Sequence, residues 1–130
     1  MSPPKGRDPF AELYGEFGDR LRGDRWQPDA DVFETDRDVV VRVEIAGVAR
    51  EDVRVGVDGR ILWINGTRKT PEPEDARKLH QMEIASGPFE RHIEISIAFE
   101  RGRVSAHLAD GFLTVTLPKQ LPQPVKVERE

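Results

Sequence analysis

Hydrophobic and polar residues alternate through most of residues 28–118. The segments with this pattern are 38–45, 53–57, 61–64, 89–95, 104–108 and 112–117. Because successive side chains of a strand point to opposite faces, each segment is predicted to be a short β-strand with one buried face. Glycine, proline and aspartate separate the segments, and no helical period lies between them. The predicted fold class is therefore all-β, with the strands arranged as an antiparallel β-sandwich.

Two Asp-Gly pairs, Asp58-Gly59 and Asp110-Gly111, lie between predicted strands. A type I′ hairpin turn needs a positive φ at both central residues, and Asp-Gly is a favoured pair for these positions. We therefore expect a β-hairpin at each pair. Between residues 67 and 82 the alternation stops, and two prolines lie among three acidic residues in the segment 70–75. Proline cannot donate a hydrogen bond to a sheet, so this segment is predicted to be an exposed loop.

Residues 1–25 precede the predicted strands and are called the arm below. Its large hydrophobic residues follow a helical spacing and are Phe10, Leu13, Tyr14, Phe17 and Leu21. Asp8 and Pro9 suit the start of a helix, whereas each glycine within the segment weakens a helix by about 1 kcal/mol relative to alanine. Two interpretations stay open: the arm orders against the surface of a partner, such as a partly unfolded client protein, or it docks on its own domain.

Residues 120–130 follow the last predicted strand and are called the extension below. Pro122 and Pro124 favour an extended backbone. Val125 and Val127 are one residue apart, which places both side chains on the same face of a strand. This pattern predicts a segment that adds to the edge of a sheet.

Composition excludes several classes of protein. A chain of 130 residues has room for one core, and the lack of cysteine excludes a disulfide framework, a Cys-ligated zinc site and a thiol nucleophile. The net charge of −4 comes from interspersed charges, so no nucleic acid is expected as a partner. No apolar run approaches the roughly 20 residues needed to span a bilayer, and residues 1–10 lack the apolar segment of a signal peptide. We expect a cytoplasmic protein without membrane insertion.

The sequence also lacks the usual signs of an enzyme. The three histidines, His80, His92 and His107, do not have the spacing of a metal-binding motif. No serine lies in a nucleophile elbow, and no glycine-rich phosphate loop occurs. We therefore expect no catalytic residues, no metal, no cofactor and no dependence on ATP.

The segment 106–119 contains the residues Ala106, Asp110, Gly111, Leu113, Val115, Leu117 and Pro118. Their order resembles the A-x-x-x-n-G-x-L signature that closes the α-crystallin domain of small heat-shock proteins of the bacterial type. Further segments follow in the order of that family, beginning with Trp26-x-Pro28 and including Phe89-x-Arg91. The resemblance covers residues 26–127 and implies an α-crystallin domain at 26–119.

The resemblance implies an immunoglobulin-like sandwich that dimerises and assembles into larger homo-oligomers. It also implies binding of partly unfolded proteins without ATP, which prevents their aggregation under stress. Within the loop, residues 77–83 fit a strand that is exchanged with the partner subunit, and its central residues are Leu79, His80, Gln81, Met82 and Glu83. Val125 and Val127 take the positions of the family's I-x-I tail motif. The smaller valine side chains are expected to loosen docking, since each buried CH₂ contributes about 0.8 kcal/mol.

Arg91 takes the position of a strand arginine that joins an ionic network between subunits in this family. The pattern alone favours a solvent-facing arginine on an alternating strand, whereas the resemblance favours the ionic network. A different function is also compatible with the fold, namely an adaptor or co-chaperone-like module that binds one defined protein partner. Such an adaptor requires neither the hydrophobic arm, nor a long loop, nor the V-x-V tail.

Overall fold

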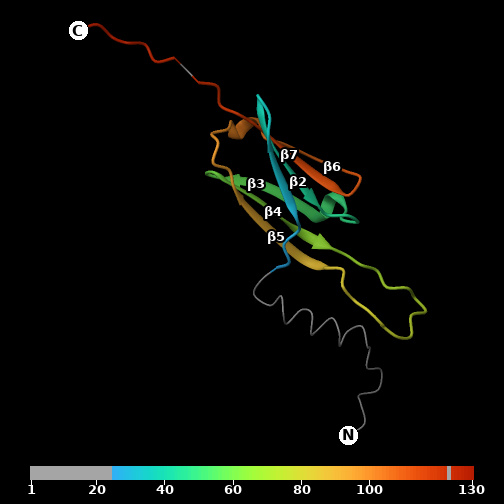
Figure 1. Ribbon diagram of the computed structural model, residues 1–130. Coiled ribbons are helices and arrows are strands. Elements are labelled where there is room, and N and C mark those ends of the chain that lie inside the picture. The colour runs from blue at the N-terminus through green and yellow to red at the C-terminus, as the bar shows by residue number, and fades with distance from the viewer. Residues whose placement is uncertain (1–24, 123) are drawn as a thin grey trace.

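The computed structural model describes residues 25–122 and 124–130, and the arm up to residue 24 lies outside the described residues. Seven strands of the described part form an immunoglobulin-like antiparallel β-sandwich, which confirms the predicted fold class (Figure 1). They are β1 (Ala30–Glu34), β2 (Asp38–Glu44), β3 (Val53–Asp58), β4 (Ile61–Arg68), β5 (Gly87–Glu94), β6 (Ser105–Ala109) and β7 (Phe112–Pro118). One sheet has the strand order β1-β2-β7-β6, and the other has the order β3-β4-β5.

The core lies between the two sheets and is built from alternate residues of the central strands. On β2 and β7 the pairing places Val41 opposite Val115, and both side chains are fully buried. Leu62 and Ile64 of β4 and Phe89 of β5 close the core from the second sheet. These residues are the hydrophobic half of the alternating pattern, so burial of one face explains why the segments fold as strands.

The two Asp-Gly pairs form hairpins of different types. At the β6–β7 hairpin, Asp110 (φ 53°) and Gly111 (φ 81°) are the two central residues, as expected for a type I′ turn. At the β3–β4 hairpin, Asp58 pairs with Ile61 as the last strand residue, and only Gly59 (φ 60°) has a positive φ. The predicted hairpin is confirmed, but the expectation of Asp-Gly at the turn centre is wrong here, because the register moves the turn one residue further along the chain.

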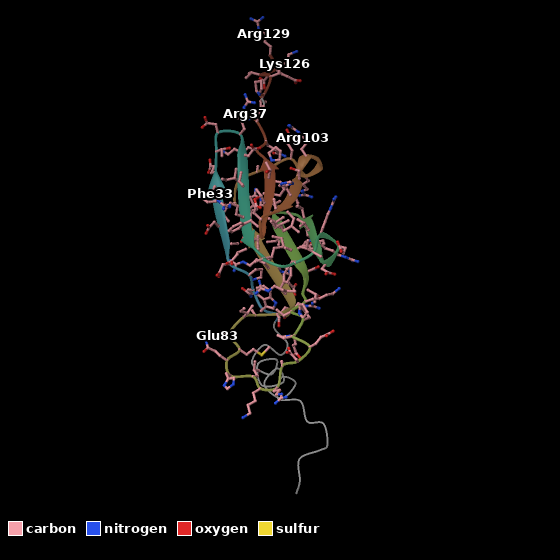
Figure 2. All side chains as sticks on the ribbon, turned by 90° about the vertical axis from the view of Figure 1, so that its right-hand side faces the viewer. Phe33, Arg37, Glu83, Arg103, Lys126 and Arg129 are labelled. Carbon is pink, nitrogen blue, oxygen red and sulfur yellow. The ribbon has the colours of Figure 1, made fainter. Side chains whose placement is uncertain are left out.

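The loop and the extension leave the sandwich at opposite ends. Figure 2 shows Glu83 at one end, and Arg37 and Arg103 at the other, where the extension departs toward Arg129. The loop begins later than expected, because β4 continues through Thr67 to Arg68. Among the described residues, no helix is long and apolar enough to cross a membrane.

Candidate interaction surfaces

A groove lies between the edges of the two sheets, where β3 and β6 have no strand beside them in the described part of the chain. Its lining residues are Arg50, Val53, Val55, Ala106, His107, Leu108 and Leu113. Val53 and Val55 lie on the face of β3 that packs against the core, and Leu108 does the same on β6. A groove between two unpaired strand edges offers backbone hydrogen bonds and side-chain pockets to an added strand, and this one combines apolar side chains with the polar Arg50 and His107.

The signature residues build one wall of this groove. Ala106 and Leu113 line it, and the alternate residues Leu113, Val115 and Leu117 are buried in the core. Gly111 carries the turn: its carbonyl accepts a hydrogen bond of 2.8 Å from the backbone N–H of Ile45. A Cβ on Gly111 would lie 3.3 Å from the Cα of Ala46, so the turn packs closely on the end of β2.

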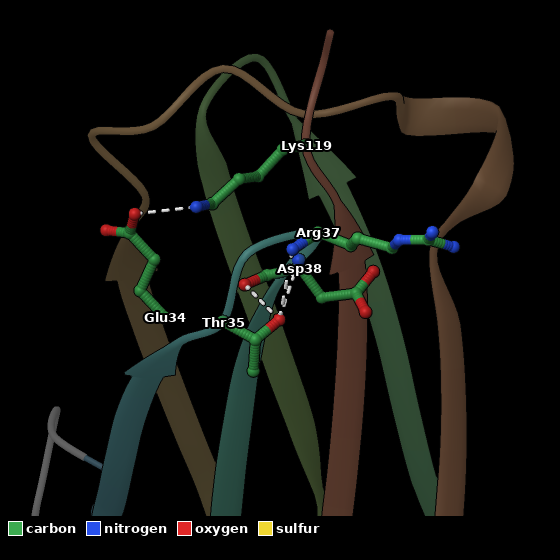
Figure 3. Close-up of polar contacts among 5 residues, drawn as sticks. All are labelled: Glu34, Thr35, Arg37, Asp38 and Lys119. Carbon is green, nitrogen blue, oxygen red and sulfur yellow. Dashed lines mark hydrogen bonds and ion pairs between the residues drawn. The ribbon is translucent and has the colours of Figure 1, made fainter.

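The extension leaves its two valines almost fully exposed to solvent, with 88% of Val125 and 90% of Val127 accessible. The first residues after β7, Lys119 and Gln120, are in contrast fixed to the sandwich and are called the root of the extension below. The Nζ of Lys119 lies 2.6 Å from the Oε2 of Glu34 at the end of β1 (Figure 3). The backbone N–H of Lys119 donates to the carbonyl of Arg37, and the next N–H, of Gln120, donates to the carbonyl of Ala98.

The turn that receives this root is closed by Thr35. The Oγ1 of Thr35 accepts hydrogen bonds from the backbone N–H groups of Arg37 (3.3 Å) and Asp38 (2.9 Å) (Figure 3). A hydroxyl that satisfies two N–H groups of its own turn fixes the local backbone. The carbonyl of Arg37 is thereby held in place for Lys119.

The outer edge of β1 is a further open strand edge. Val32 is 52% exposed and Phe33 45% exposed, although they point to opposite faces of the sheet. The residues predicted to form the exchanged strand, 79–83, lie in the loop between β4 and β5 and are not part of any strand in this single chain. Of these residues Leu79 and Met82 are half-buried, and the side-chain amide of Gln81 donates to the carboxylate of Glu83.

Arg91 pairs with Ile64 in the register of β4 and β5, so it shares the inward face of β5 with Phe89 and Ile93. Its side chain is half-buried rather than turned freely to solvent. Among residues 25–122 and 124–130, no carboxylate lies within ion-pair distance of Arg91.

The three histidines lie apart from one another. His80 is exposed in the loop, His107 lies at the groove, and the Nε2 of His92 lies 2.7 Å from the Oε1 of Glu90 on the outward face of β5. Arg25 approaches the same carboxylate from the other side, at 3.6 Å. In the part of the chain that the structure describes, no group of three potential ligands is arranged to hold a metal ion.

Sequence reasoning missed one further cluster, at the base of the loop. The guanidinium of Arg68 lies 4.4 Å over the ring of Trp26 and donates two hydrogen bonds to the carbonyl of Ala85. The indole Nε1 of Trp26 donates a 3.0 Å hydrogen bond to the carbonyl of Gly87. No local pattern indicates this cluster, because its members come from distant parts of the chain.

Comparison with known proteins finds small heat-shock proteins both among sequences and among solved structures. The sequence model of the Hsp20/alpha crystallin family matches residues 31–130. The 16.9 kDa class I heat shock protein 1 of Triticum aestivum is 33% identical over 126 residues, which cover 86% of this chain and 83% of that protein. Small heat shock protein C2 of Rickettsia felis is 29% identical over 93 residues, covering 72% of this chain. Several curated relatives are longer: the chain spans 60%, 54%, 56% and 46% of four of them.

Solved structures share the same fold. Heat shock protein 16.0 from Schizosaccharomyces pombe superposes with a TM-score of 0.66 at 33% identity, covering 79% of this chain and 99% of that one. A small heat-shock protein from Xylella fastidiosa, described as having a distinct high order structure, gives a TM-score of 0.66 at 25% identity and covers 81% of this chain and 99% of that one.

Proposed function

Because the chain belongs to the Hsp20/alpha crystallin family, we propose that it is an ATP-independent chaperone that holds partly unfolded proteins and prevents their aggregation under stress. The observation that carries this proposal is the groove between the unpaired edges of β3 and β6, which combines apolar side chains with polar groups, in a chain whose extension exposes two valines. Surfaces of this kind bind extended apolar segments with little demand on their sequence.

In this proposal the extension of one subunit docks in the groove of another. Val125 and Val127 are separated by one residue, and so are Val53 and Val55 on the groove-lining face of β3. Residues with this spacing are about 7 Å apart along a strand, so the two pairs match when the extension is added as a strand. This contact links dimers into larger homo-oligomers, and its release opens the groove to other apolar segments.

The dimer forms by strand exchange at β1. Residues 77–83 of one subunit pair with the open edge of β1 in the other and cover Val32 and Phe33, which are half-exposed in the single chain. Strand addition satisfies the free backbone groups of the edge and lowers the exposure of Val32 on one face of the sheet and of Phe33 on the other. A partner subunit also supplies the carboxylate that compensates Arg91, whose half-buried charge has no ion-pair partner within the described residues.

Client proteins bind through the arm. Its hydrophobic residues Phe10, Leu13, Tyr14, Phe17 and Leu21 lie outside the described residues, so their assignment as client-binding residues rests on the sequence. The three-part organisation follows from these roles: the arm at 1–25 binds clients, the domain at 26–119 dimerises, and the extension at 120–130 links dimers. Nothing in this cycle requires ATP or catalysis.

The proposal is tested by client capture. A fluorescently labelled, heat-labile protein is heated with the full chain in the absence of ATP, and size-exclusion chromatography then separates complexes from free client. We expect a large soluble complex that contains both proteins, and less of it with a chain that lacks the arm, residues 1–25. If the chain elutes as a monomer and the client precipitates as it does alone, the chaperone proposal fails and an adaptor for one defined partner is favoured.

A further inference from the structure

The side chain of Arg68 fastens the base of the loop that carries residues 77–83. Arg68 is the last residue of β4 and pairs with Gly87, the first residue of β5, so these two residues bound the loop 69–86. The Nε and Nη2 of Arg68 both donate to the carbonyl of Ala85, and Nη1 lies 3.4 Å from the carbonyl of Ala46. The returning end of the loop is therefore held against β4 by a forked contact.

Trp26 adds a second attachment at the same place. The plane of its ring lies under the Arg68 guanidinium at 4.4 Å, its Nε1–H donates to the carbonyl of Gly87, and its ring packs at 5.2 Å from that of Phe89. Trp26 is itself only 8% exposed. Arg68 thus connects the segment that follows the arm, the end of β4 and the returning end of the loop.

We propose that Arg68, stacked on Trp26, is a positioning residue that sets the direction in which the loop leaves the sandwich and so presents residues 77–83 to the partner subunit. This inference rests on the strand exchange proposed above. This positioning role requires the planar guanidinium of arginine. A lysine ammonium cannot donate from two fixed directions to the Ala85 carbonyl while it stacks on an indole. The same contact ties the position of the loop to the segment that leads out of the arm.

The chain contains only two tryptophans, so a single substitution leaves Trp26 as the one fluorescent tryptophan. In a Trp63→Phe background, Trp26 is the only tryptophan and its fluorescence reports on the cluster. We expect Arg68→Lys to shift its emission to longer wavelength, to increase quenching by acrylamide, and to raise amide exchange of residues 84–87 by about tenfold. The dissociation constant of the dimer is expected to rise about tenfold as well, the change that corresponds to one lost charge-assisted hydrogen bond.

Arg54→Lys is the matched control, because Arg54 lies exposed on the outward face of β3 and takes part in no ion pair or hydrogen bond of its side chain in the described structure. It should leave all four readouts unchanged. Trp26→Phe keeps a ring for stacking but removes the donor to Gly87, and we expect it to weaken the dimer less than Arg68→Lys does. If Arg68→Lys does not fold, Arg68→Gln takes its place, since it retains a planar donor without the charge.

Arg68→Lys with wild-type amide exchange and a wild-type dimer constant would overturn the inference. A loss of amide protection without any weakening of the dimer would also overturn it, because Arg68 would then stabilise the loop without presenting the exchanged strand. Failure of the strand exchange itself is recognised separately, because the unsubstituted chain would then remain monomeric at every concentration. The fluorescence of Trp26 still reports on the Arg68 contact in that case, because it needs no partner subunit.

Discussion

Lys119 and Glu34 join the root of the extension to the end of β1 through an ion pair of 2.6 Å. The lysine side chain is only 18% exposed and the carboxylate 56%, so the pair lies at the surface with its cation sheltered. In the proposed assembly, β1 receives the exchanged strand and the extension docks on another dimer. The two contacts that build the oligomer therefore start from neighbouring points of one subunit.

Loss of this ion pair should have a small and salt-dependent effect. We expect Glu34→Gln to lower the free energy of unfolding by about 0.5–1 kcal/mol, because the exposed carboxylate is well screened by water. In a double-mutant cycle with Lys119→Met, the coupling energy measured by urea unfolding should fall as salt is raised. Lys126→Met, which changes an exposed lysine of the extension, is the control. A coupling energy of zero at low salt would contradict the importance of the pair.

The extension is tested by removing its apolar side chains. Val125→Ala combined with Val127→Ala should reduce the mass of the assembly in multi-angle light scattering, because the two valine side chains no longer fill the groove. Ala106→Glu, which places a charge in the groove, should have the same effect from the receiving side. Glu128→Ala is the control and should leave the mass unchanged. An assembly of unchanged mass in both groove and tail variants would show that this contact is not the link.

Arg91→Ala tests the compensation of a half-buried charge. Breaking a fully buried pair costs about 3–5 kcal/mol, and we expect a smaller loss of dimer stability here because Arg91 is half-buried. Sedimentation velocity at decreasing concentration should detect earlier dissociation of the variant. Arg54→Ala, at an exposed arginine of β3, serves as the control. Should Arg91→Ala dissociate and melt like the unsubstituted chain, no subunit contact depends on this residue.

Gly66 provides a test of the sandwich itself. A Cβ at this position would meet the backbone carbonyl of Asp52 and the ring of Phe89, neither of which can move freely. We expect Gly66→Ala to destabilise the domain by about 1–3 kcal/mol through overpacking. Gly102→Ala is the matched control, because a Cβ there meets nothing within 4 Å. Thermal unfolding followed by circular dichroism compares the two, and equal midpoints would contradict the packing described around Gly66.

The central strands could be predicted from the sequence because burial of one face imposes a period of two. Val39, Val41 and Val43 of β2 are buried while Arg42 and Glu44 are exposed, which is the alternation that the sequence displays. β1 has no such signal, since four of its five residues are exposed in the single chain. Its strand character comes from pairing with β2, a contact that no local pattern encodes.

The candidate site was predictable where it depends on local geometry. Asp110-Gly111 marks its turn because few other residues adopt a positive φ. The role of Val125 and Val127 as one face of a docking strand stays a prediction, since neither residue lies in a strand of this single chain. The position of Arg68 over Trp26 was not predictable, because tertiary packing alone brings them together. For the same reason the sequence left the environment of Arg91 open, and the register of β4 and β5 places it on the inward face.

The measurement that tests the central claim most directly is light scattering of a heat-stressed model client with and without this protein, in the absence of ATP. The mass of the free protein is determined in parallel by multi-angle scattering. Because exposed apolar surface on a charged multimer keeps bound clients in solution, we predict a multimer that suppresses scattering in proportion to its concentration. A monomer that leaves the scattering of the client unchanged would contradict the account.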